Sequence, residues 1–416
     1  MLIHNIGRLV TPHVDAADDL TRPVFALENA AVWIEDGRFK DIGLSFDLLK
    51  RVPASVPRHD ANARLMLPGF VDCHSHPAFV GNRAHEFFLR NRGADYQEIL
   101  AAGGGIHATA ARVAAASVSQ IVTESLPRLE SSLAGGVTTI ECKSGYGLNW
   151  AGEEKLLVAL RELSKICPQH IVRTLLIHAV PQEWRERRAE FLETVIDEMI
   201  PETRERALAE RVDVFCEEGA FTVDEARSIL AAGRACGLDM TIHANQFGHS
   251  GGALLAAELG TRSADHLEYL NESEMRSLAA ANVVAVALPA CVYFMNTIPY
   301  PPLRQMIAAG LRVAIATDMN PGTAMTESIP FCMTTAAIYG KLSAAELLWA
   351  VTYDAARALG REGVAGVIES GRPADFALWG VPDLESLVYY MGQCTADEVW
   401  IGGELVFEHA SLLRRY

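Results

Sequence analysis

The chain has 416 residues, half of them hydrophobic, and a formal net charge of −16. This length suits one large domain with an appendage, or two domains, and the composition is ample for a sizeable core. The acidic excess argues against a nucleic-acid partner and against binding to an anionic membrane, because both need clustered Lys and Arg. A small anionic substrate is still compatible, since one local Arg can dominate a pocket.

The sequence shows no sign of export or membrane insertion. Residues 1–15 lack a basic start followed by an apolar core. The most apolar window, residues 278–295, is interrupted by Asn282 and Pro289, which favours a helix end, a buried strand and a loop over a membrane span. The eight cysteines include no C-x-x-C pair. We therefore expect a cytoplasmic protein with reduced thiols.

The two ends of the chain share one style of sequence. Residues 31–43, "AVWIEDGRFKDIG", alternate as a strand does and contain an Asp-Gly hairpin signal. Residues 371–380 and 398–407 repeat this style, with Gly402-Gly403 as a turn. We predict a small composite β-sandwich domain made from residues 1–68 and 361–416.

The stretch "FVDCHSH", residues 70–76, begins the central region. If it is one strand, Asp72, His74 and His76 point to the same side. Two imidazoles and a carboxylate at one strand end form either a polar surface patch or part of a metal site. The motif alone does not decide between them.

A long segment, residues 77–136, follows this first strand. It contains "GGGIHATAARVAAAS", a Gly-rich loop that runs into a helix. Gly103 to Gly105 are explained equally by a flexible connector and by a mobile cover over an active site.

Short apolar runs then alternate with helical stretches up to about residue 360. Including the first, the eight runs are residues 70–76, 137–143, 173–179, 212–217, 240–246, 263–269, 283–289 and 312–318. Most are continuous in Val, Ile and Leu, as expected for strands covered on both faces. Residues 223–239 illustrate an intervening helix, with Gly237 as a plausible stop. An open doubly wound sheet is the competitor, but no G-x-G-x-x-G turn follows the first strand. We predict a (β/α)8 TIM barrel over residues 69–360.

Ionisable side chains mark the ends of these runs. They are His74, His76, Lys143, His178, Glu217, His243, His266 and Asp318. Active sites of such barrels lie at the carboxyl ends of the strands, and a purely structural barrel has no need of these groups there. Their shared position favours a metal site.

Three histidines and one carboxylate make a reasonable site for Zn²⁺ or Fe²⁺. His74, His76, His243 and Asp318 form such a set. Asp318 can also accept a proton from water as a general base, and His266 is placed to polarise an attacked carbonyl. We favour one divalent metal ion. A second ion bridged by Glu217, or by a carboxylated Lys143, stays open.

The ligand pattern on successive strands, together with the terminal sandwich, resembles the metal-dependent amidohydrolase superfamily. Within it the chain resembles the imidazolonepropionase family over nearly its whole length. The segments that carry this resemblance are residues 68–106, 141–148 ("ECKSGYGL"), 212–227, 251–269 and 316–323 ("ATDMNPGT"). The resemblance implies metal-dependent hydrolysis of 4-imidazolone-5-propanoate, a small anionic substrate, to N-formimino-L-glutamate in histidine degradation. It also implies a homodimer.

The resemblance assigns roles to individual residues. It gives His74, His76, His243 and Asp318 as ligands of Zn or Fe. Substrate contacts fall on Arg83, Tyr146, His178 and Gln246, and product contacts fall on Asn320, Gly322 and Thr323. Arg83 suits this role because a guanidinium can pair with a carboxylate through two hydrogen bonds.

Two positions depart from the family pattern. Asn245 stands where an acidic side chain is more usual, and Ala290 stands where the family has Gly after Pro289. Both put the fine shape of the substrate pocket in question. A related amidohydrolase, such as a deaminase or a hydantoinase-like enzyme acting on another carboxylate-bearing heterocycle, is the alternative. A non-catalytic barrel has little reason to keep the full ligand set.

Overall fold

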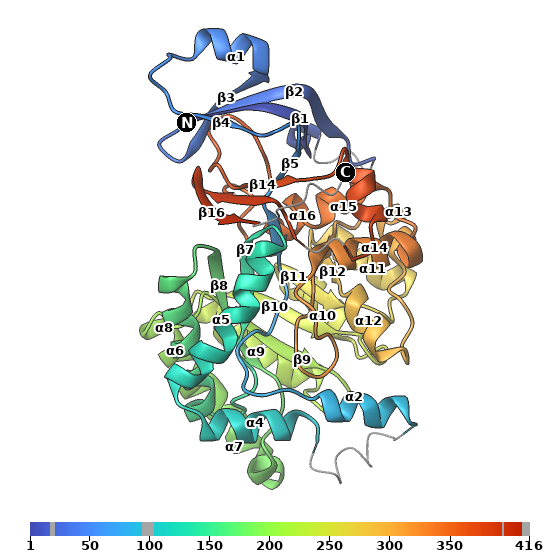
Figure 1. Cartoon of the computed structure of the whole chain (residues 1–416). Helices are drawn as coiled ribbons and strands as arrows, with labels where there is room; N and C mark the ends of the chain where they lie inside the picture. Colours follow the sequence, from blue (N-terminus) through green and yellow to red (C-terminus); the bar gives the residue numbers. More distant parts are fainter. Residues whose placement is uncertain (17–20, 94–103, 393–394, 410–416) are drawn as a thin grey trace.

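The computed structural model describes residues 1–16, 21–93, 104–392 and 395–409. Two sheets organise them, a parallel barrel in the middle of the chain and a separate sheet that both termini build (Figure 1). The predicted fold class is confirmed. The expected domain boundaries, at residues 68/69 and 360/361, stay a prediction.

Eight parallel strands form the barrel in the order of the sequence. They are β6 (Phe70–Asp72), β7 (Val137–Lys143), β8 (His170–Ile177), β9 (Arg211–Cys216), β10 (Asp239–Ala244), β11 (Ser263–His266), β12 (Val284–Ala287) and β13 (Val313–Ile315). The last strand approaches the first just beyond their ends, where the amide of His76 donates to the carbonyl of Met319 at 2.9 Å and the amide of Asp318 donates to the carbonyl of His74 at 3.0 Å. The barrel thus closes at the level where the ionisable side chains lie.

Helices surround the barrel and connect its strands. They are α5 (Val118–Ala134), α6 (Trp150–Ile166), α7 (Arg188–Thr194), α8 (Ile200–Glu205), α9 (Val223–Ala235), α10 (Gly252–Leu259), α11 (Glu272–Ala280), α12 (Pro289–Met295), α13 (Leu303–Ala308), α14 (Ile329–Gly340), α15 (Ala344–Ala350) and α16 (Tyr353–Ala358). Helix α9 shows the local logic, because Thr222 and Glu225 close its first turn in a capping box. Gly237 follows its end with φ +76°, which confirms the predicted stop.

The terminal sheet combines strands from both ends of the chain. In spatial order they are β16 (Glu404–Glu408), β15 (Glu398–Ile401), β14 (Phe376–Trp379), β5 (Leu65–Pro68), β1 (Leu2–Pro12), β2 (Val24–Glu35) and β3 (Arg38–Leu44), and β4 (Arg58–Asp60) also pairs with β1. The rings of Phe39 and Phe376 lie 6.0 Å apart although three strands separate β3 from β14. The sheet therefore folds over a core that strands from both ends of the chain share, as the predicted sandwich requires.

Both predicted hairpins of the terminal sheet are confirmed. Asp36 and Gly37 join β2 to β3 with φ of 50° and 72°, and Gly402 and Gly403 join β15 to β16 with φ of 57° and 76°. Two consecutive residues with positive φ are the signature of the two-residue turn that matches strand twist.

The segment 77–136 contributes three helices in its described residues, 77–93 and 104–136. Besides α5 these are α2 (Ala84–Asn91) and α4 (Ile106–Ala115), which lie at the end of the barrel away from the terminal sheet (Figure 1). The proposed mobile cover falls partly on residues 94–103, including Gly103, which lie outside the described residues. Residues from α2 and α4 line the cavity described below.

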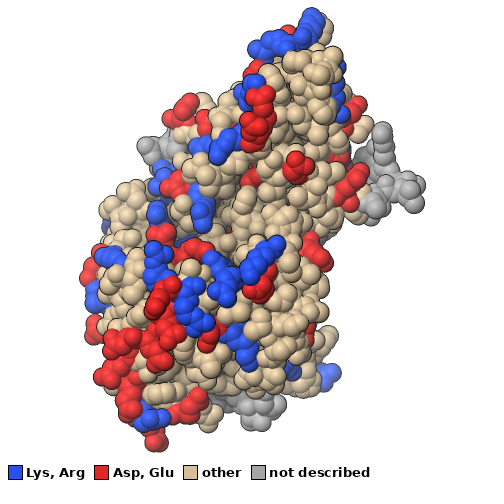
Figure 2. Space-filling view, turned by 90° about the vertical axis from the view of Figure 1, so that its left-hand side faces the viewer, with Lys and Arg blue, Asp and Glu red and all other residues tan. Residues whose placement is uncertain are grey.

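Surface charge and helix length can be compared with the partners that the composition argued against, which are nucleic acids and membranes. On the face in Figure 2, basic and acidic side chains are interspersed and do not form one broad basic patch. In the described part of the chain, every helix is too short or too polar to cross a membrane.

Candidate metal centre and active site

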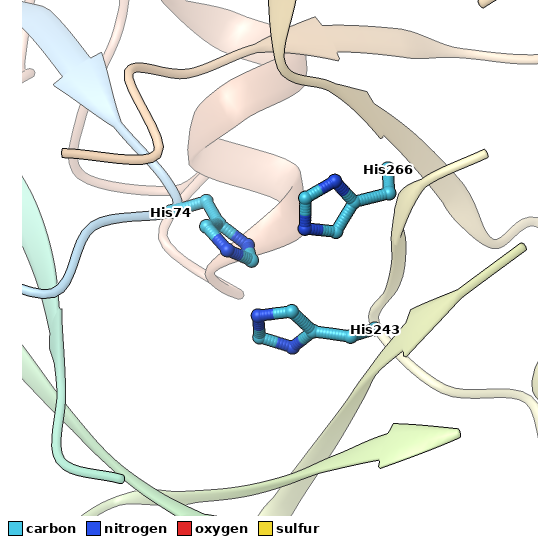
Figure 3. Close-up of side chains that lie close together, drawn as sticks. All are labelled: His74, His243 and His266. Atoms are coloured by element: carbon cyan, nitrogen blue, oxygen red, sulfur yellow. The ribbon is translucent and has the colours of Figure 1, made fainter. Parts of the chain in front are cut away.

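Side chains from four strand ends of the barrel come close together. The Nε2 atoms of His74 and His76 lie 3.2 Å apart, and Oδ1 of Asp318 lies 3.5 Å and 3.4 Å from them. His74 also groups with His243 and His266, each offering one ring nitrogen within 4.8 Å of the others (Figure 3). Lone pairs aimed at one another repel unless a cation lies between them, so this donor set fits a divalent metal ion.

The local backbone differs from the prediction in one respect. Strand β6 ends at Asp72, so His74 and His76 follow the strand rather than belong to it. The side chain of Asp72 does not join the cluster, because its Oδ2 accepts a hydrogen bond from the Thr317 hydroxyl at 2.6 Å. The expectation that Asp72 points into the site with both histidines is wrong. The alternation of a regular strand does not apply beyond the end of its ladder.

Strained backbone recurs at the ends of other strands. Asn245, His266 and Asp318 follow or end β10, β11 and β13, and their φ angles are 56°, 79° and 51°. Such conformations are unfavourable for residues with a side chain and persist where the surroundings enforce them. In these conformations the side chains of His266 and Asp318 line the cavity described below.

Buried carboxylates lie behind the histidines of this cluster. Oδ2 of Asp265 lies 2.7 Å from Nδ1 of His74, and Oδ2 of Asp213 lies 2.9 Å from Nδ1 of His243. A carboxylate at Nδ1 holds the proton there and leaves Nε2 free for a metal ion. Oε1 of Glu268 lies 3.4 Å from Nδ1 of His266 in the same manner.

Lys143 lies among these carboxylates and not in the cavity. Its Nζ is 2.8 Å from Asp213, 2.9 Å from Glu141 and 3.6 Å from Asp265, and all four side chains are fully buried. Burial alone would lower the pKa of Lys143, but the three carboxylates raise it above its ordinary value. Carboxylation of this lysine would add a negative charge among the carboxylates, which argues against Lys143 as a bridge between two metals.

Asp318 combines features of a ligand and of a base. Burial would raise its pKa, but hydrogen bonds to His74 and His76 hold it well below the usual range. His266, Cys291 and Asp318 also form a close group of possible ligand atoms. Because His266 is within reach of Asp318 on the cavity side, both can act on the same bound molecule.

One cavity of about 1180 Å³ opens above this cluster. All the predicted substrate and product residues belong to its lining, together with His76, His243, His266 and Asp318. These residues are Arg83, Tyr146, His178, Gln246, Asn320, Gly322 and Thr323. Their convergence was expected, while their individual roles stay predictions.

A tight turn links the metal cluster to the guanidinium of Arg83. Nδ2 of Asn320 donates to the carbonyl of Asp318 at 2.6 Å, and its Oδ1 accepts from the amides of Gly322 and Thr323 at 2.8 Å each. A Cβ at Gly322 would lie 2.5 Å from Nη1 of Arg83, so a side chain there would collide with the guanidinium. The turn therefore lies directly against the guanidinium of Arg83.

Arg83 is already oriented from its other side. Its Nε and Nη2 lie 2.8 Å and 2.7 Å from Oε2 of Glu86. Arg90, also in the lining, donates to the carbonyl of Gly322 at 2.7 Å. Two guanidinium groups against one carboxylate leave this wall of the cavity with a net positive charge, which suits an anionic ligand.

Tyr146, His178 and Gln246 also belong to the lining. The ring of Tyr146 lies 6.2 Å from that of His76 and 5.9 Å from that of His178. Burial lowers the pKa of His178 to about 3, so its imidazole is neutral near pH 7. The backbone amide of Gln246 donates to Oε1 of Glu217 at 2.6 Å. Glu217 thus supports a loop and is absent from the candidate metal groups of the described residues.

The two departures from the family pattern lie outside the cavity surface. Asn245 is buried, and its Nδ2 donates to the carbonyl of Tyr269 at 2.8 Å and to Glu274 at 3.1 Å. It therefore ties two neighbouring loops together. Ala290 is buried in α12. Neither is among the described residues that line the cavity, so neither shapes that lining directly.

Sequence reasoning did not identify Asp213, Asp265 and Arg90. Asp213 and Asp265 interrupt the apolar runs of β9 and β11, and a carboxylate inside a buried strand is a signal that could have found them. Arg90 left no comparable signal, because an Arg on a short helix is ordinary.

The barrel and this cluster together define a metal-dependent hydrolase. The model of the amidohydrolase family matches residues 65–406. An imidazolonepropionase of Geobacillus kaustophilus is 43% identical over 384 residues, covering 91% of this chain and 90% of that protein. An imidazolonepropionase of Geobacillus thermodenitrificans is 41% identical, covering 98% and 97%. The chain therefore belongs to the amidohydrolase family and, within it, to the imidazolonepropionases.

Solved structures show the same fold at lower identity. A 5-methylcytosine deaminase of Klebsiella pneumoniae superposes with a TM-score of 0.76 at 17% identity, covering 100% of this chain and 99% of that one. An adenosine deaminase of Xanthomonas campestris with bound zinc has a TM-score of 0.71 at 19% identity, covering 98% and 92%. At this identity the likeness speaks for the fold alone.

Proposed function

We propose that this enzyme hydrolyses the ring amide C–N bond of 4-imidazolone-5-propanoate to give N-formimino-L-glutamate, a step of histidine degradation. One observation carries the proposal. The turn from Asp318 to Thr323 connects the metal cluster to the guanidinium of Arg83 within one cavity. A ring whose carbonyl lies at the cluster can thus place a short carboxylate tail at Arg83. The names of the relatives at 41–43% identity support the same substrate.

The residues proposed to hold the metal are His74, His76, His243 and Asp318, with one divalent ion, Zn or Fe. When bound, such an ion acts as a Lewis acid and lowers the pKa of water. The close approach of ligand atoms and the carboxylates behind His74 and His243 support this set. The metal content of protein purified without added metal distinguishes Zn from Fe.

The chain's own residues account for the proton transfers. Asp318 accepts a proton from the attacking water, whose oxygen bonds to the ring carbonyl carbon. His266 stabilises the negative charge that develops on the carbonyl oxygen. When the C–N bond breaks, Asp318 returns the proton to the departing nitrogen. The new carboxylate is received by Asn320, Gly322 and Thr323.

Arg83 gives the site its preference among ring substrates. Its charge pairs with the propanoate tail, while Tyr146, His178 and Gln246 contact the ring. Neutral nucleobases, which a deaminase on the same scaffold would take, offer no carboxylate to this positive wall. Binding them would leave the guanidinium without its partner. This favours the imidazolone over the alternative heterocycles.

The test is Arg83→Ala with 4-imidazolone-5-propanoate as substrate. The tail contact exists before and during the reaction, so KM should rise by about 100-fold while kcat changes much less. Arg276→Ala, which changes an exposed arginine paired with Glu272, is the matched control. An unchanged KM in Arg83→Ala would reject the assignment.

The homodimer and the cytoplasmic location expected from the sequence stay part of this proposal. Light scattering on the purified enzyme tests the first, and cell fractionation tests the second.

A further inference from the structure

A buried carboxylate behind the cavity holds the loop that carries Tyr146. Glu153 lies in the first turn of α6 and is 1% exposed. Its Oε2 accepts a hydrogen bond from the amide of Gly145 at 2.7 Å, and its Oε1 accepts from the amides of Gly147 at 2.8 Å and Leu148 at 2.6 Å. Three backbone donors of one short loop therefore converge on a single side chain.

The loop around Tyr146 has an unusual backbone conformation. Tyr146 is flanked by Gly145 and Gly147, which have no side chains that could pack. The φ angle of Leu148 is 61°, which is unfavourable for a residue with a side chain, whereas the φ of 108° at Gly145 is one that glycine adopts readily. A Cβ at Gly147 would lie 2.1 Å from the backbone nitrogen of Glu153, so the loop lies directly on the start of α6.

The surroundings of Glu153 have opposing effects on the pKa of its carboxyl group. Burial raises the pKa of Glu153, while hydrogen bonds from the Ser144 side chain and from the loop amides oppose the shift. The ionised carboxylate accepts charge-assisted bonds from the amides, which are stronger than neutral ones. Glu153 is absent from the described lining of the cavity, so it does not reach a bound molecule itself.

We propose that Glu153 is a positioning residue that fixes Tyr146 against the substrate through the amides of Gly145, Gly147 and Leu148. This inference rests on the proposed function, because the contact between Tyr146 and the substrate is part of it. Glu153 acts entirely through the loop and takes no part in proton transfer.

The experiment compares Glu153→Gln with the wild-type enzyme. Gln keeps the size but replaces one acceptor oxygen by an NH2 donor, which cannot pair with the amides. KM should rise about tenfold, with kcat changed less than about threefold. Amide hydrogen exchange at Gly145, Gly147 and Leu148 should become faster, and this readout needs no substrate.

Two further variants isolate the mechanism. Glu154→Gln changes the neighbouring residue on the same helix, which pairs with Arg206 near the surface, and should leave KM and loop exchange unchanged. In a double variant of Glu153→Gln and Tyr146→Phe, KM should rise no further than in the more affected single variant, because both act through one contact.

Several results would overturn the inference. One is wild-type KM together with wild-type loop exchange in Glu153→Gln. Another is a double variant whose KM multiplies the two single effects, since Glu153 would then act elsewhere. If Glu153→Gln does not fold, Glu153→Asp keeps the charge with a shorter reach and should show the same changes to a lesser degree. A wild-type enzyme that leaves 4-imidazolone-5-propanoate intact would refute the proposed function, while loop exchange would still test Glu153.

Discussion

The barrel interior beneath the strand ends and the core of the terminal sheet contain different kinds of side chain. The core of the terminal sheet consists of aliphatic and aromatic side chains such as Ile6, Val32, Phe39, Phe376 and Trp400. The barrel interior beneath the strand ends instead buries an ionic cluster, whose members are Glu141, Lys143, Arg211, Asp213 and Asp265. Both regions are equally well shielded from water, so shielding does not explain the difference.

The different side chains indicate different roles, stabilisation in the terminal sheet and function in the barrel interior. Apolar burial stabilises a fold at little cost, whereas a buried charge loses hydration and needs partners to be tolerated. In the barrel each carboxylate has such a partner, and two of them also orient the histidines His74 and His243. The ionic cluster is therefore best understood as a support for the candidate metal centre. Substitutions in the barrel interior should therefore affect the reaction, and substitutions in the terminal sheet should affect stability.

The largest effect is expected for Asp318→Asn in the barrel. The variant lacks the proposed base, so kcat should fall by about 1000-fold or more. The fold should persist, because the amide oxygen of the new side chain still accepts hydrogen bonds. Steady-state kinetics with circular dichroism measures both, and turnover near the wild-type level would refute Asp318 as the base.

Phe376→Ala is the matching change in the terminal sheet. The ring is fully buried, stacks on Trp400 at 5.6 Å and lies 6.0 Å from Phe39. Its removal should lower the free energy of unfolding by about 3–5 kcal/mol, while kcat of the folded protein stays unchanged. Phe46→Ala, at a residue 68% exposed, is the control for denaturant titration. A specific loss of kcat would show that the two regions are not independent.

Asp265→Asn should weaken metal binding without removing a ligand. Asn offers a donor as well as an acceptor to Nδ1 of His74, so the ring is no longer held in one tautomer. Metal affinity, measured by competition with a chelator, should fall by about 10–100-fold. Asp239→Asn, at an exposed pair with Arg262, should leave the affinity unchanged. Equal metal affinity in Asp265→Asn and Asp239→Asn would show that the ionic cluster does not support metal binding.

The smallest effect is expected at the contact between the two regions. Nε2 of His170, on β8, lies 3.0 Å from Asp375, just before β14, and this hydrogen bond raises the pKa of His170. A raised folded-state pKa gives stability that is present below the unfolded-state pKa and lost as pH rises through the folded-state value. Relative to His170→Gln, the wild type should gain less than about 1 kcal/mol at low pH, because the ring is partly exposed. Denaturant unfolding at pH 6 and pH 9 measures this, and a larger gain at pH 9 would contradict it.

The sequence alone was sufficient for much of the fold. Apolar runs located all eight barrel strands, and the prediction for β7, residues 137–143, matches the structure. Strand ends were less certain, since β6 ends at Asp72 and not at His76. There the Thr317 hydroxyl donates a hydrogen bond to Asp72. This contact joins residues 245 positions apart, so no local sequence pattern indicates it.

The candidate site divides in the same manner. The proximity of His74, His76, His243, His266 and Asp318 could be predicted because strand ends of a barrel meet at one rim, while their roles stay predictions. The partners of Lys143 and the role of Glu153 were not found. Both depend on which buried atoms meet in three dimensions, and a Lys at a strand end has the same appearance whether it faces a ligand or three carboxylates.

The most direct test of the central claim is the ring opening of freshly generated 4-imidazolone-5-propanoate, followed as loss of its ultraviolet absorbance. Enzyme as purified, enzyme treated with a chelator and enzyme with metal restored would be compared. We expect fast turnover that is lost with the chelator and regained with Zn or Fe. Absence of turnover by metal-replete protein would contradict the proposed substrate.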